Sequence, residues 1–341
     1  MKAKDISGQA PGGKRTKLAE ILPLKTPFVI QVFPVYACNF KCNYCVFSVN
    51  PEKRGFISDK VIMDLMLYKK CVDDMSKFPE KIKVLRFVGI GEPLLHKDIV
   101  EMIGYTVKKN VALKVELLTN ASLLTSEMSD ALIERGLSRL VVSLQGTSKE
   151  IYEEVCGIKI DFNKFIDNLK YFYENKQSTE MYLKIVDTAL KGEDDKKKYF
   201  KLFGDICDTI AVEHTVPIHS GIDYKDILTD DREKMTQFGL PVEELDICSQ
   251  PFFTMQINPD GKVVPCYSFE YPGIMGDCNN EALNDIWNGK IFTEFRMKML
   301  SGIKNTGEVC KNCNISKYRS FPEDSLNKDA DRLKKLYRGD S

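Results

Sequence analysis

The chain has 341 residues, of which 43% are hydrophobic, so it can bury the core of one large domain with a smaller module beside it. Lysine plus arginine and aspartate plus glutamate both number 49, and this balance predicts neither a nucleic-acid nor a membrane partner. The first residues lack the apolar segment of a secretion signal, and no apolar run has the length of a membrane span, which predicts a cytoplasmic protein. In a reducing compartment, 11 clustered cysteines indicate metal ligands rather than disulfides.

Residues 1–26 are polar and contain Pro11-Gly12-Gly13, which predicts a flexible N-terminal arm. Between residues 27 and 225, short runs of β-branched and aliphatic residues alternate with amphipathic helical patterns. The expected strands are residues 27–35, 81–89, 111–119, 137–144, 180–187 and 208–214. This alternation predicts an α/β fold with a parallel sheet, which right-handed crossovers curl into a full or partial barrel with the helices outside.

Two of the helical patterns are especially clear. The first covers residues 58–75 and begins at Ser58, which we expect to cap the helix. The second covers residues 161–176. In both, apolar side chains recur at three- and four-residue spacing: Val61, Leu65, Tyr68 and Val72 in the first, and Phe162, Phe165, Leu169 and Phe172 in the second. Because active sites of parallel sheets lie at the carboxyl ends of the strands, functional residues should follow the strands directly.

The pattern changes after about residue 225, which predicts a separate module over residues 226–320. Residues 248–313 hold five of the cysteines and the turn sequence Asn258-Pro259-Asp260-Gly261, which predicts a hairpin. The tail, residues 321–341, is strongly charged, and we expect it to end in a helix.

Three cysteines, Cys38, Cys42 and Cys45, follow the first expected strand within eight residues. Thiolates are soft ligands that select zinc, copper(I) or an iron–sulfur cluster. Since zinc usually takes four protein ligands, three thiolates without an obvious fourth leave one metal position open for another molecule.

Polar groups follow the next strands. After the second strand come Gly91 and Glu92, where a glycine lets the backbone approach a ligand and a carboxylate can accept hydrogen bonds from an ammonium group. Asn120 and Ser143 follow the third and fourth strands, although polar residues there also cap helices. Later strand ends carry Lys184, Asp187, Glu213 and His214, which either face a substrate or have ordinary solvated or core positions.

These motifs, C-x3-C-x2-C and G-x-G-E-P in register after the first two strands, resemble those of the radical S-adenosylmethionine (radical SAM) superfamily. The resemblance implies a partial (βα)6 barrel in which Cys38, Cys42 and Cys45 hold a [4Fe–4S] cluster, while the amino and carboxylate groups of SAM chelate the fourth iron. It also implies that the residues around SAM are Tyr44 beside the adenine, Gly91, Glu92 and Pro93 at the amino group, and Asn120 and Ser143 near the ribose and carboxylate. Ile90, Ala121 and Gln145 depart from the usual motifs.

The cysteines of the C-terminal module make a four-thiolate site, for which zinc is a rival on spacing alone. The surrounding sequence resembles the SPASM module of radical SAM enzymes, or its shorter relative, the twitch module. The resemblance implies an auxiliary [4Fe–4S] cluster with Cys248, Cys266, Cys310 and Cys313 as ligands. Because no cysteine follows Cys313, we expect one auxiliary cluster and interpret Cys278 as a non-ligand.

The resemblance implies reductive cleavage of SAM to a 5′-deoxyadenosyl radical, with a flavodoxin or ferredoxin as electron donor. We expect oxidation of a small polar molecule, such as a sugar or cyclitol alcohol, with Glu213 or His214 as the base. One alternative is a maturase that modifies a ribosomally made peptide or a protein side chain. The other is a non-catalytic zinc-binding scaffold.

Overall fold

The computed structural model describes residues 1–9, 15–55, 58–219, 221–225, 227–228 and 234–339. Its strands join in one sheet in the order β1-β7-β6-β5-β4-β3-β2-β8-β9-β10. The strands are β1 Lys4–Asp5, β2 Val29–Val32, β3 Ile82–Phe87, β4 Ala112–Thr119, β5 Arg139–Leu144, β6 Glu180–Val186, β7 Thr209–Glu213, β8 Thr254–Ile257, β9 Lys262–Val264 and β10 Gly276–Asp277.

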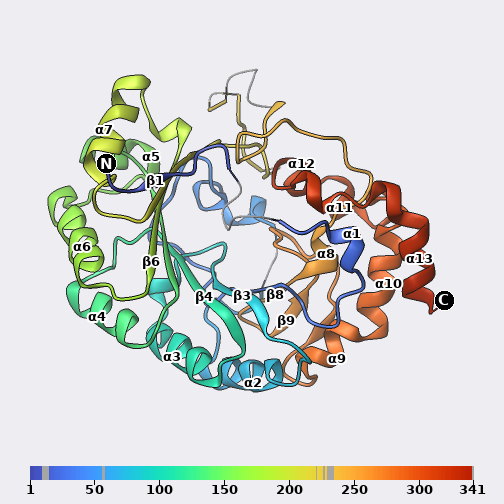
Figure 1. Cartoon of the computed structure of the whole chain (residues 1–341). Helices are drawn as coiled ribbons and strands as arrows, with labels where there is room; N and C mark the ends of the chain where they lie inside the picture. Colours follow the sequence, from blue (N-terminus) through green and yellow to red (C-terminus); the bar gives the residue numbers. More distant parts are fainter. Residues whose placement is uncertain (10–14, 56–57, 220, 226, 229–233, 340–341) are drawn as a thin grey trace.

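Strands β2 to β7 are parallel, and each pairs with the next along the chain, as the α/β prediction required. All six expected strands are present, and helices cover the outside of the curved sheet (Figure 1). The helices are α1 Leu18–Ile21, α2 Leu65–Met75, α3 Ile99–Lys109, α4 Ser126–Glu134, α5 Lys149–Cys156, α6 Phe162–Asn175, α7 Glu193–Phe203, α8 Gln250–Phe253, α9 Leu283–Asn288, α10 Lys290–Met299, α11 Glu308–Lys311, α12 Ile315–Tyr318 and α13 Ala330–Arg338. The part of the chain that the structure describes contains no helix with the length and apolar character of a membrane span.

The two clear helical patterns fare differently. Helix α6 confirms its pattern, since it begins after the capping residue Asp161 and buries Phe165, Leu169 and Phe172. The cap predicted at Ser58 is wrong, because the hydroxyl of Ser58 bonds within its own turn to the backbone of Lys60. Helix α2 begins seven residues later.

The true cap of helix α2 is Asp64, whose Oδ1 accepts hydrogen bonds from the N–H groups of Met66 and Leu67. Val61 therefore lies before the helix, and it is exposed rather than buried. Tyr68 and Val72 face the core, as the periodicity predicts.

Residues 1–9 and 15–26, which we expected to form a flexible arm, pack against the rest of the chain. Strand β1 pairs with β7 and so covers the edge of the parallel sheet, which would otherwise present unpaired backbone groups. Leu18 and Leu22 are buried in the core, and Arg15 makes an ion pair with Asp324 near the other end of the chain. The Pro11-Gly12-Gly13 motif lies outside the described residues.

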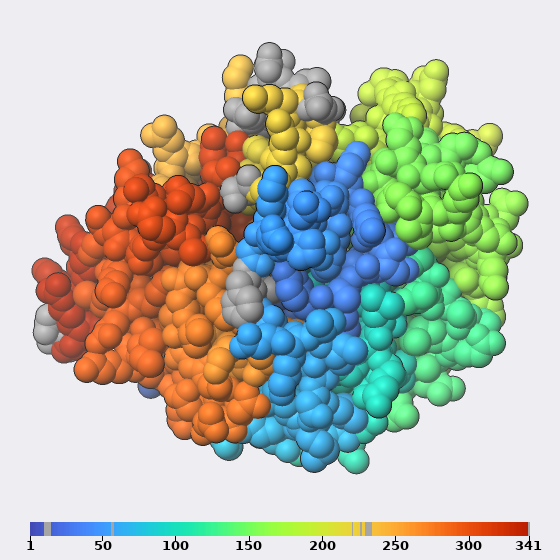
Figure 2. Space-filling view, turned by 180° about the vertical axis from the view of Figure 1, so that it is seen from behind, coloured from blue at the N-terminus to red at the C-terminus, as the bar shows by residue number. Residues whose placement is uncertain are grey.

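The sheet continues without a break into the C-terminal part of the chain. Strand β8 pairs in parallel with β2, and β9 returns antiparallel to β8 after the predicted turn at residues 258–261. Helices α9 to α13 pack on this side, opposite the helices of the barrel (Figure 1). Seen from behind, the blue segments near the start of the chain lie between the orange C-terminal part and the green barrel helices (Figure 2).

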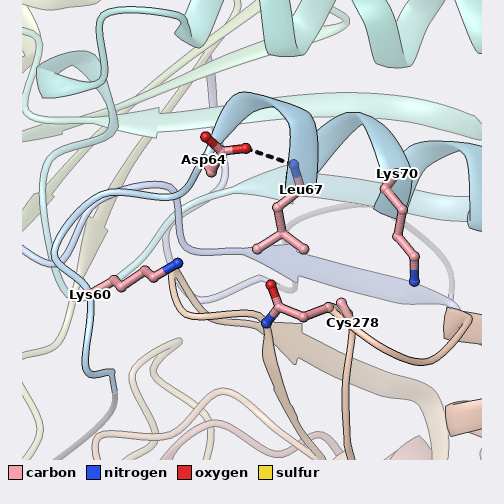
Figure 3. Close-up of a pocket in the computed structure, with 6 residues that line it drawn as sticks. Lys60, Asp64, Leu67, Lys70 and Cys278 are labelled. Carbon is pink, nitrogen blue, oxygen red and sulfur yellow. Dashed lines mark hydrogen bonds between the residues drawn. The ribbon is translucent and has the colours of Figure 1, made fainter.

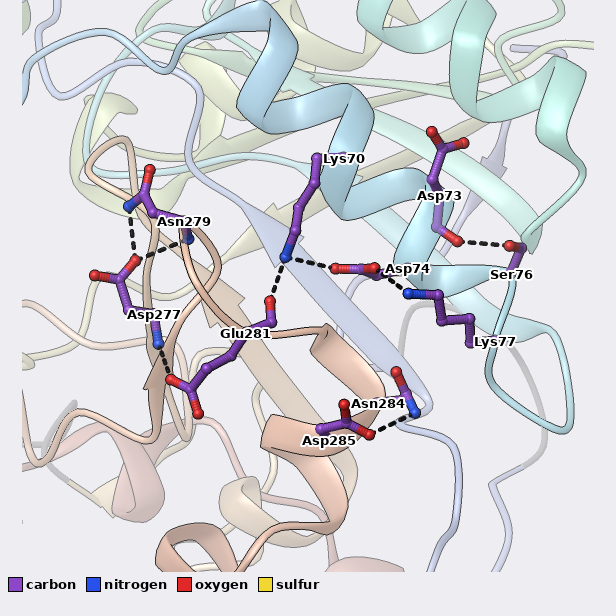
Figure 4. A network of polar contacts seen from close by, with 10 residues as sticks. All are labelled: Lys70, Asp73, Asp74, Ser76, Lys77, Asp277, Asn279, Glu281, Asn284 and Asp285. Carbon is purple, nitrogen blue, oxygen red and sulfur yellow. Dashed lines mark hydrogen bonds and ion pairs between the residues drawn. The ribbon is translucent and has the colours of Figure 1, made fainter.

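Helix α2 and residues 277–285 form a polar seam between the two parts. The ammonium group of Lys70 reaches the carbonyl oxygen of Glu281 and pairs with Asp74 at 2.8 Å (Figure 4). A small cavity of about 300 Å³ opens at this seam, with Lys60 and Lys70 on its walls (Figure 3). The seam fixes the C-terminal part against the barrel.

We predict that Asp64→Ala lowers the free energy of unfolding by about 1 kcal/mol, because two backbone donors at the start of α2 lose their acceptor. Asp64→Asn keeps an acceptor oxygen and should show a smaller loss. Urea denaturation followed by circular dichroism measures both variants. An equal loss in the two variants would contradict the capping role.

Candidate functional site

A cavity of about 680 Å³ lies over the concave side of the sheet and collects most of the predicted site residues. They are Cys38, Cys42, Tyr44, Cys45, Gly91, Glu92, Asn120, Ser143, Glu213 and His214. Pro93 lies just outside it, at the start of the short 3-10 helix Pro93–Leu95. The four cysteines of the C-terminal module lie elsewhere and are described below.

The three N-terminal cysteines lie on the loop that follows β2. Helix α5 anchors this loop, because the N–H of Lys41 donates to the carbonyl oxygen of Cys156 at 3.0 Å. Burial raises the pKa of the Cys38 thiol to about 12, and the neighbouring Cys45 adds to the rise. Burial also raises the pKa of Cys42 well above its usual value, with contributions from Cys45 and Cys38. The three thiols therefore lie within electrostatic reach of one another.

Asn120 ties the end of β4 to the cysteine loop. Its Nδ2 donates to Oδ1 of Asn39 at 2.9 Å and lies 3.9 Å from Sγ of Cys38. Ser122 completes a closed set of amide and hydroxyl contacts with both asparagines. Asn120 thus positions a thiol, whether or not it also contacts a ligand.

Close backbone contact requires a glycine at position 91. Its φ is +152°, and a Cβ at this position would lie 2.1 Å from the carbonyl oxygen of Val35. The side chain of Ile90, which departs from the usual motif, is buried in a cluster with Phe33 and Val46, behind the loop. The backbone at Gly91 therefore touches the start of the cysteine loop despite the substitution at Ile90.

Glu92 is almost fully buried, and protein donors contact both of its carboxylate oxygens. Oε1 accepts from the hydroxyl of Thr119 at 2.6 Å, and Oε2 accepts from the N–H of Asn120 at 2.7 Å. Burial raises the pKa of this carboxyl group, and these hydrogen bonds offset only part of the rise. The N–H of Leu94 also donates to Oε1, at 2.9 Å. A carboxylate has about four acceptor positions, so Glu92 retains capacity for one further donor.

Two residues that we expected to contact SAM remain: Ser143 lies near the end of β5, and Tyr44 lies in the cysteine loop. The hydroxyl of Tyr44 donates to Oε1 of Gln145, whose amide in turn donates to the carbonyl oxygen of Ser143 at 3.1 Å. Gln145 thus links the loop to the strand end, although it departs from the usual motif. His96 is buried and bonds to the carbonyl oxygen of Met63, which is a structural role.

The four cysteines of the C-terminal module also come together. Burial raises the pKa of Cys266 well above its usual value, and Cys248, Cys313 and Cys310 each raise it further. Cys278 lies apart from them, in contact with the thiol of Cys71, which with burial raises its pKa. The structure therefore brings together the four cysteines that we expected to share a cluster, and it places Cys278 outside that group.

The donor chemistry of both thiol groups fits iron–sulfur clusters, which proteins hold through cysteine thiolates. The raised pKa values mean that the free thiols are protonated at neutral pH, so a metal must displace those protons. Among the described residues, no three His, Cys, Asp or Glu side chains are arranged to hold one single ion. A cluster of several irons is wider than one ion and needs more widely spaced thiolates.

The far wall of the cavity carries an ion-pair network around Glu213. Its Oε2 accepts from Nζ of Lys184 at 2.7 Å and from Nε2 of Gln237 at 2.6 Å, and its Oε1 accepts from the hydroxyl of Tyr182 at 3.2 Å. Burial alone would raise the pKa of Glu213, but Lys184, Gln237 and Arg319 together outweigh that effect and lower it. Both oxygens are occupied, which makes Glu213 a poor proton acceptor.

His214 is held differently. Its Nδ1 lies 2.8 Å from Oδ2 of Asp187, and its backbone N–H donates to the carbonyl oxygen of Gln237 at 2.9 Å. This pairing fixes the orientation of the imidazole ring at the cavity wall. An imidazole oriented by a carboxylate has the arrangement of a general base.

Several cavity residues were missed by the sequence analysis: Arg86, Glu116, Arg139, Gln237 and Arg319. Arg86 and Glu116 interrupt apolar strands, and Arg139 begins one, at positions that line the cavity; these charges were an available signal. Gln237 and Arg319 come from segments without strand or motif context, so no sequence signal identified them.

Comparisons with known proteins agree with this geometry. The model of the radical SAM superfamily matches residues 32–202, and that of an iron–sulfur cluster-binding domain, SPASM, matches residues 248–314. A tungsten-containing aldehyde ferredoxin oxidoreductase cofactor-modifying protein from Pyrococcus furiosus is 27% identical over 302 residues, covering 76% of this chain and 80% of the relative. The S-adenosyl-L-methionine-dependent 2-deoxy-scyllo-inosamine dehydrogenase of Niallia circulans is 23% identical over 291 residues, covering 84% of this chain and 92% of the relative.

Solved structures show the same fold. The crystal structure of BtrN in complex with AdoMet and 2-DOIA superposes with a TM-score of 0.52 at 22% identity, covering 84% of this chain and 92% of that one. The native anSMEcpe structure with bound AdoMet gives a TM-score of 0.59 at 17% identity, covering 92% and 97%.

We predict that Gly91→Ala destabilises the protein severely, because the added Cβ meets backbone that cannot move aside. The matched control is Gly157→Ala, at a residue with φ +68° and open space around it, which should cost about 1 kcal/mol. Urea denaturation should show a loss for Gly91→Ala that is larger by at least about 2 kcal/mol. Equal losses would contradict the close contact.

Proposed function

Because the chain belongs to the radical SAM superfamily, we propose that it cleaves SAM reductively and uses the radical to oxidise an alcohol carbon of a small polar molecule. The superfamily domain implies a [4Fe–4S] cluster and SAM, and the SPASM domain implies auxiliary iron–sulfur binding. The observation that carries the proposal is that three thiols and the buried carboxylate of Glu92 line one cavity.

In this proposal, Cys38, Cys42 and Cys45 hold the SAM-binding cluster, and the remaining acceptor capacity of Glu92 receives the ammonium group of SAM. When bound, the cluster and SAM supply an electron and a 5′-deoxyadenosyl radical that removes a hydrogen atom from the substrate. The other residues proposed to contact SAM are Tyr44, Gly91, Pro93, Asn120 and Ser143. The cavity walls orient the substrate and exclude water.

The auxiliary cluster is assigned to the C-terminal thiols. Its four proposed ligands are Cys248, Cys266, Cys310 and Cys313, and the contact of Cys278 with Cys71 supports its exclusion. A cluster with four protein ligands suits electron transfer rather than substrate binding, and it would accept the second electron of the alcohol oxidation. A flavodoxin or ferredoxin is the proposed electron donor, in the cytoplasm, where cysteine thiols stay reduced.

Of the two candidate bases, His214 is better suited to accept the hydroxyl proton. Its orientation by Asp187 supports this role, whereas Glu213 is occupied by Lys184, Gln237 and Tyr182. Glu213 then has an electrostatic role, since it balances cations on the cavity wall.

Peptide modification is the second candidate. The PqqA peptide cyclase of Bradyrhizobium diazoefficiens is 22% identical over 332 residues, covering 88% of this chain and 81% of the relative. A peptide substrate would use the same cofactor groups. Deuterium transfer from substrate carbon into 5′-deoxyadenosine, tested with polyols and with peptides encoded nearby, distinguishes the two candidates.

We predict that the protein, reconstituted without oxygen, binds about eight irons with matching sulfide, four in each of two clusters. The triple variant Cys38→Ala/Cys42→Ala/Cys45→Ala should keep about four irons and form no 5′-deoxyadenosine with dithionite. The double variant Cys310→Ala/Cys313→Ala should lose the other cluster. Binding of zinc without iron would support the non-catalytic scaffold instead.

We predict that His214→Gln lowers the rate of substrate oxidation at least about 100-fold, as expected for loss of a general base. The variant should still form 5′-deoxyadenosine without substrate, because the residue does not contact the cysteine loop. A normal rate in His214→Gln, with a defect in Glu213→Gln, would reverse the assignment.

A further inference from the structure

Four charged side chains of alternating sign form a row across neighbouring strands of the barrel. Their Cα atoms are in direct register: Arg86 on β3 faces Glu116 on β4, which faces Arg139 on β5, which faces Glu180 on β6. The interior of a parallel barrel is usually filled with apolar side chains. This charged row therefore needs an explanation beyond packing.

The charged row lies away from the proposed SAM-binding edge. Arg139 begins β5, and Ser143 lies four residues further along the same face of that strand, a separation of about 13 Å at about 3.3 Å per residue. Val141 and Tyr182 lie between the two levels on neighbouring strands. The row thus belongs to a different part of the same cavity.

The carboxylates on the cavity wall are already occupied. Glu116 Oε2 accepts a hydrogen bond from Nε of Arg86 at 2.8 Å, and Nη2 of the same guanidinium lies 2.7 Å away in the ion pair. Glu92 and Glu213 are engaged as described above, and Asp324 pairs with Arg15. Apart from the acceptor capacity that Glu92 retains, a ligand therefore meets carboxylates that protein donors or cations already contact.

Donors, in contrast, remain available. Arg139 is only 6% exposed, and its Nε has no hydrogen-bond partner among the described residues. Its Nη2 lies 3.1 Å from Glu180, and its guanidinium lies 4.8 Å from the centre of the Tyr182 ring. Leaving a buried donor unpaired destabilises the folded protein, and a ligand oxygen at Nε would remove that cost.

The cavity wall also carries more positive than negative side chains. Among the described residues that line the cavity, six are lysine or arginine and four are glutamate or aspartate. The cations are Arg15, Lys83, Arg86, Arg139, Lys184 and Arg319, and the anions are Glu92, Glu116, Glu213 and Asp324. A cationic amine would meet like charge here, whereas an anionic group would meet opposite charge.

We propose that the substrate carries a carboxylate group, and that Arg139 binds it at the charged row. The planar guanidinium can donate through Nε to a carboxylate oxygen while Nη groups keep their contacts with the row. This rests on the proposed function and narrows its substrate class from polar molecules to carboxylates. A sugar acid and an acidic residue of a peptide both supply this chemistry.

Binding of matched probes to the reconstituted full-length protein with SAM tests the proposal. Isothermal titration calorimetry at constant ionic strength compares glucuronate, glucose and glucosamine, which share one ring. A second arm compares the capped peptides Gly-Glu-Gly and Gly-Gln-Gly. The acidic member of at least one arm should bind about tenfold more tightly than its neutral or amine counterpart, and the arm that responds identifies the source of the carboxylate.

Arg139→Gln should reduce that preference to below about twofold, with folding checked by circular dichroism. The control Lys108→Gln removes a cation from the outer helix α3, outside the cavity, and should keep the preference. No acidic preference in the wild-type protein, or a preference for glucosamine, would overturn the proposal without any variant. So would a preference that survives Arg139→Gln or disappears in Lys108→Gln. Formation of 5′-deoxyadenosine by the wild type reports separately on the radical SAM function.

Discussion

The buried contact between the end of β3 and the cysteine loop is the constraint on which the site depends. Gly91 brings backbone against backbone, and the N–H of Glu92 donates to the carbonyl oxygen of Ala37 at 2.8 Å. The Glu92 carboxylate then holds the end of β4 through Thr119 and Asn120. One buried residue thus fixes two strand ends and the loop with the three thiols, and such preorganised contacts keep a reactive centre in place.

The C-terminal part is tied to the same region through the sheet rather than through a linker. Strand β8 pairs with β2, and the N–H of Phe33, just after β2, donates to the carbonyl oxygen of Ile257 at 3.0 Å. Tyr267, beside Cys266, packs its ring edge-on against Phe33, and the guanidinium of Arg319 lies 5.1 Å from the centre of the Tyr267 ring. The two thiol groups are therefore parts of one packed structure, and substitutions in the C-terminal module will affect the walls of the barrel cavity.

Sequence reasoning succeeded where the signal is local. Alternating strand and helix patterns located the six parallel strands, and cysteine spacing identified the two groups of thiols that the structure brings together. It failed where long-range pairing decides the outcome. The sequence of residues 1–26 is polar, but β1 pairs with the edge of β7, and Leu18 is buried in the core. The helix start at Asp64 was missed because Ser58 satisfies its hydroxyl in a local turn, and sequence alone cannot distinguish two competing caps.

The charged row inside the barrel was missed for a related reason: single charges in strands were visible in the sequence, but only the strand register brings them into line. Charged residues buried between β-strands are costly unless they are paired, and a chain that keeps Arg139 buried with an unpaired Nε gives up stability there. Such local costs are concentrated at functional sites, where a ligand completes the missing contact. In our two proposals, the two levels of the cavity have separate roles: the residues at the carboxyl ends of the strands hold the cluster and SAM, and the charged row nearer the amino ends of β5 and β6 binds the substrate.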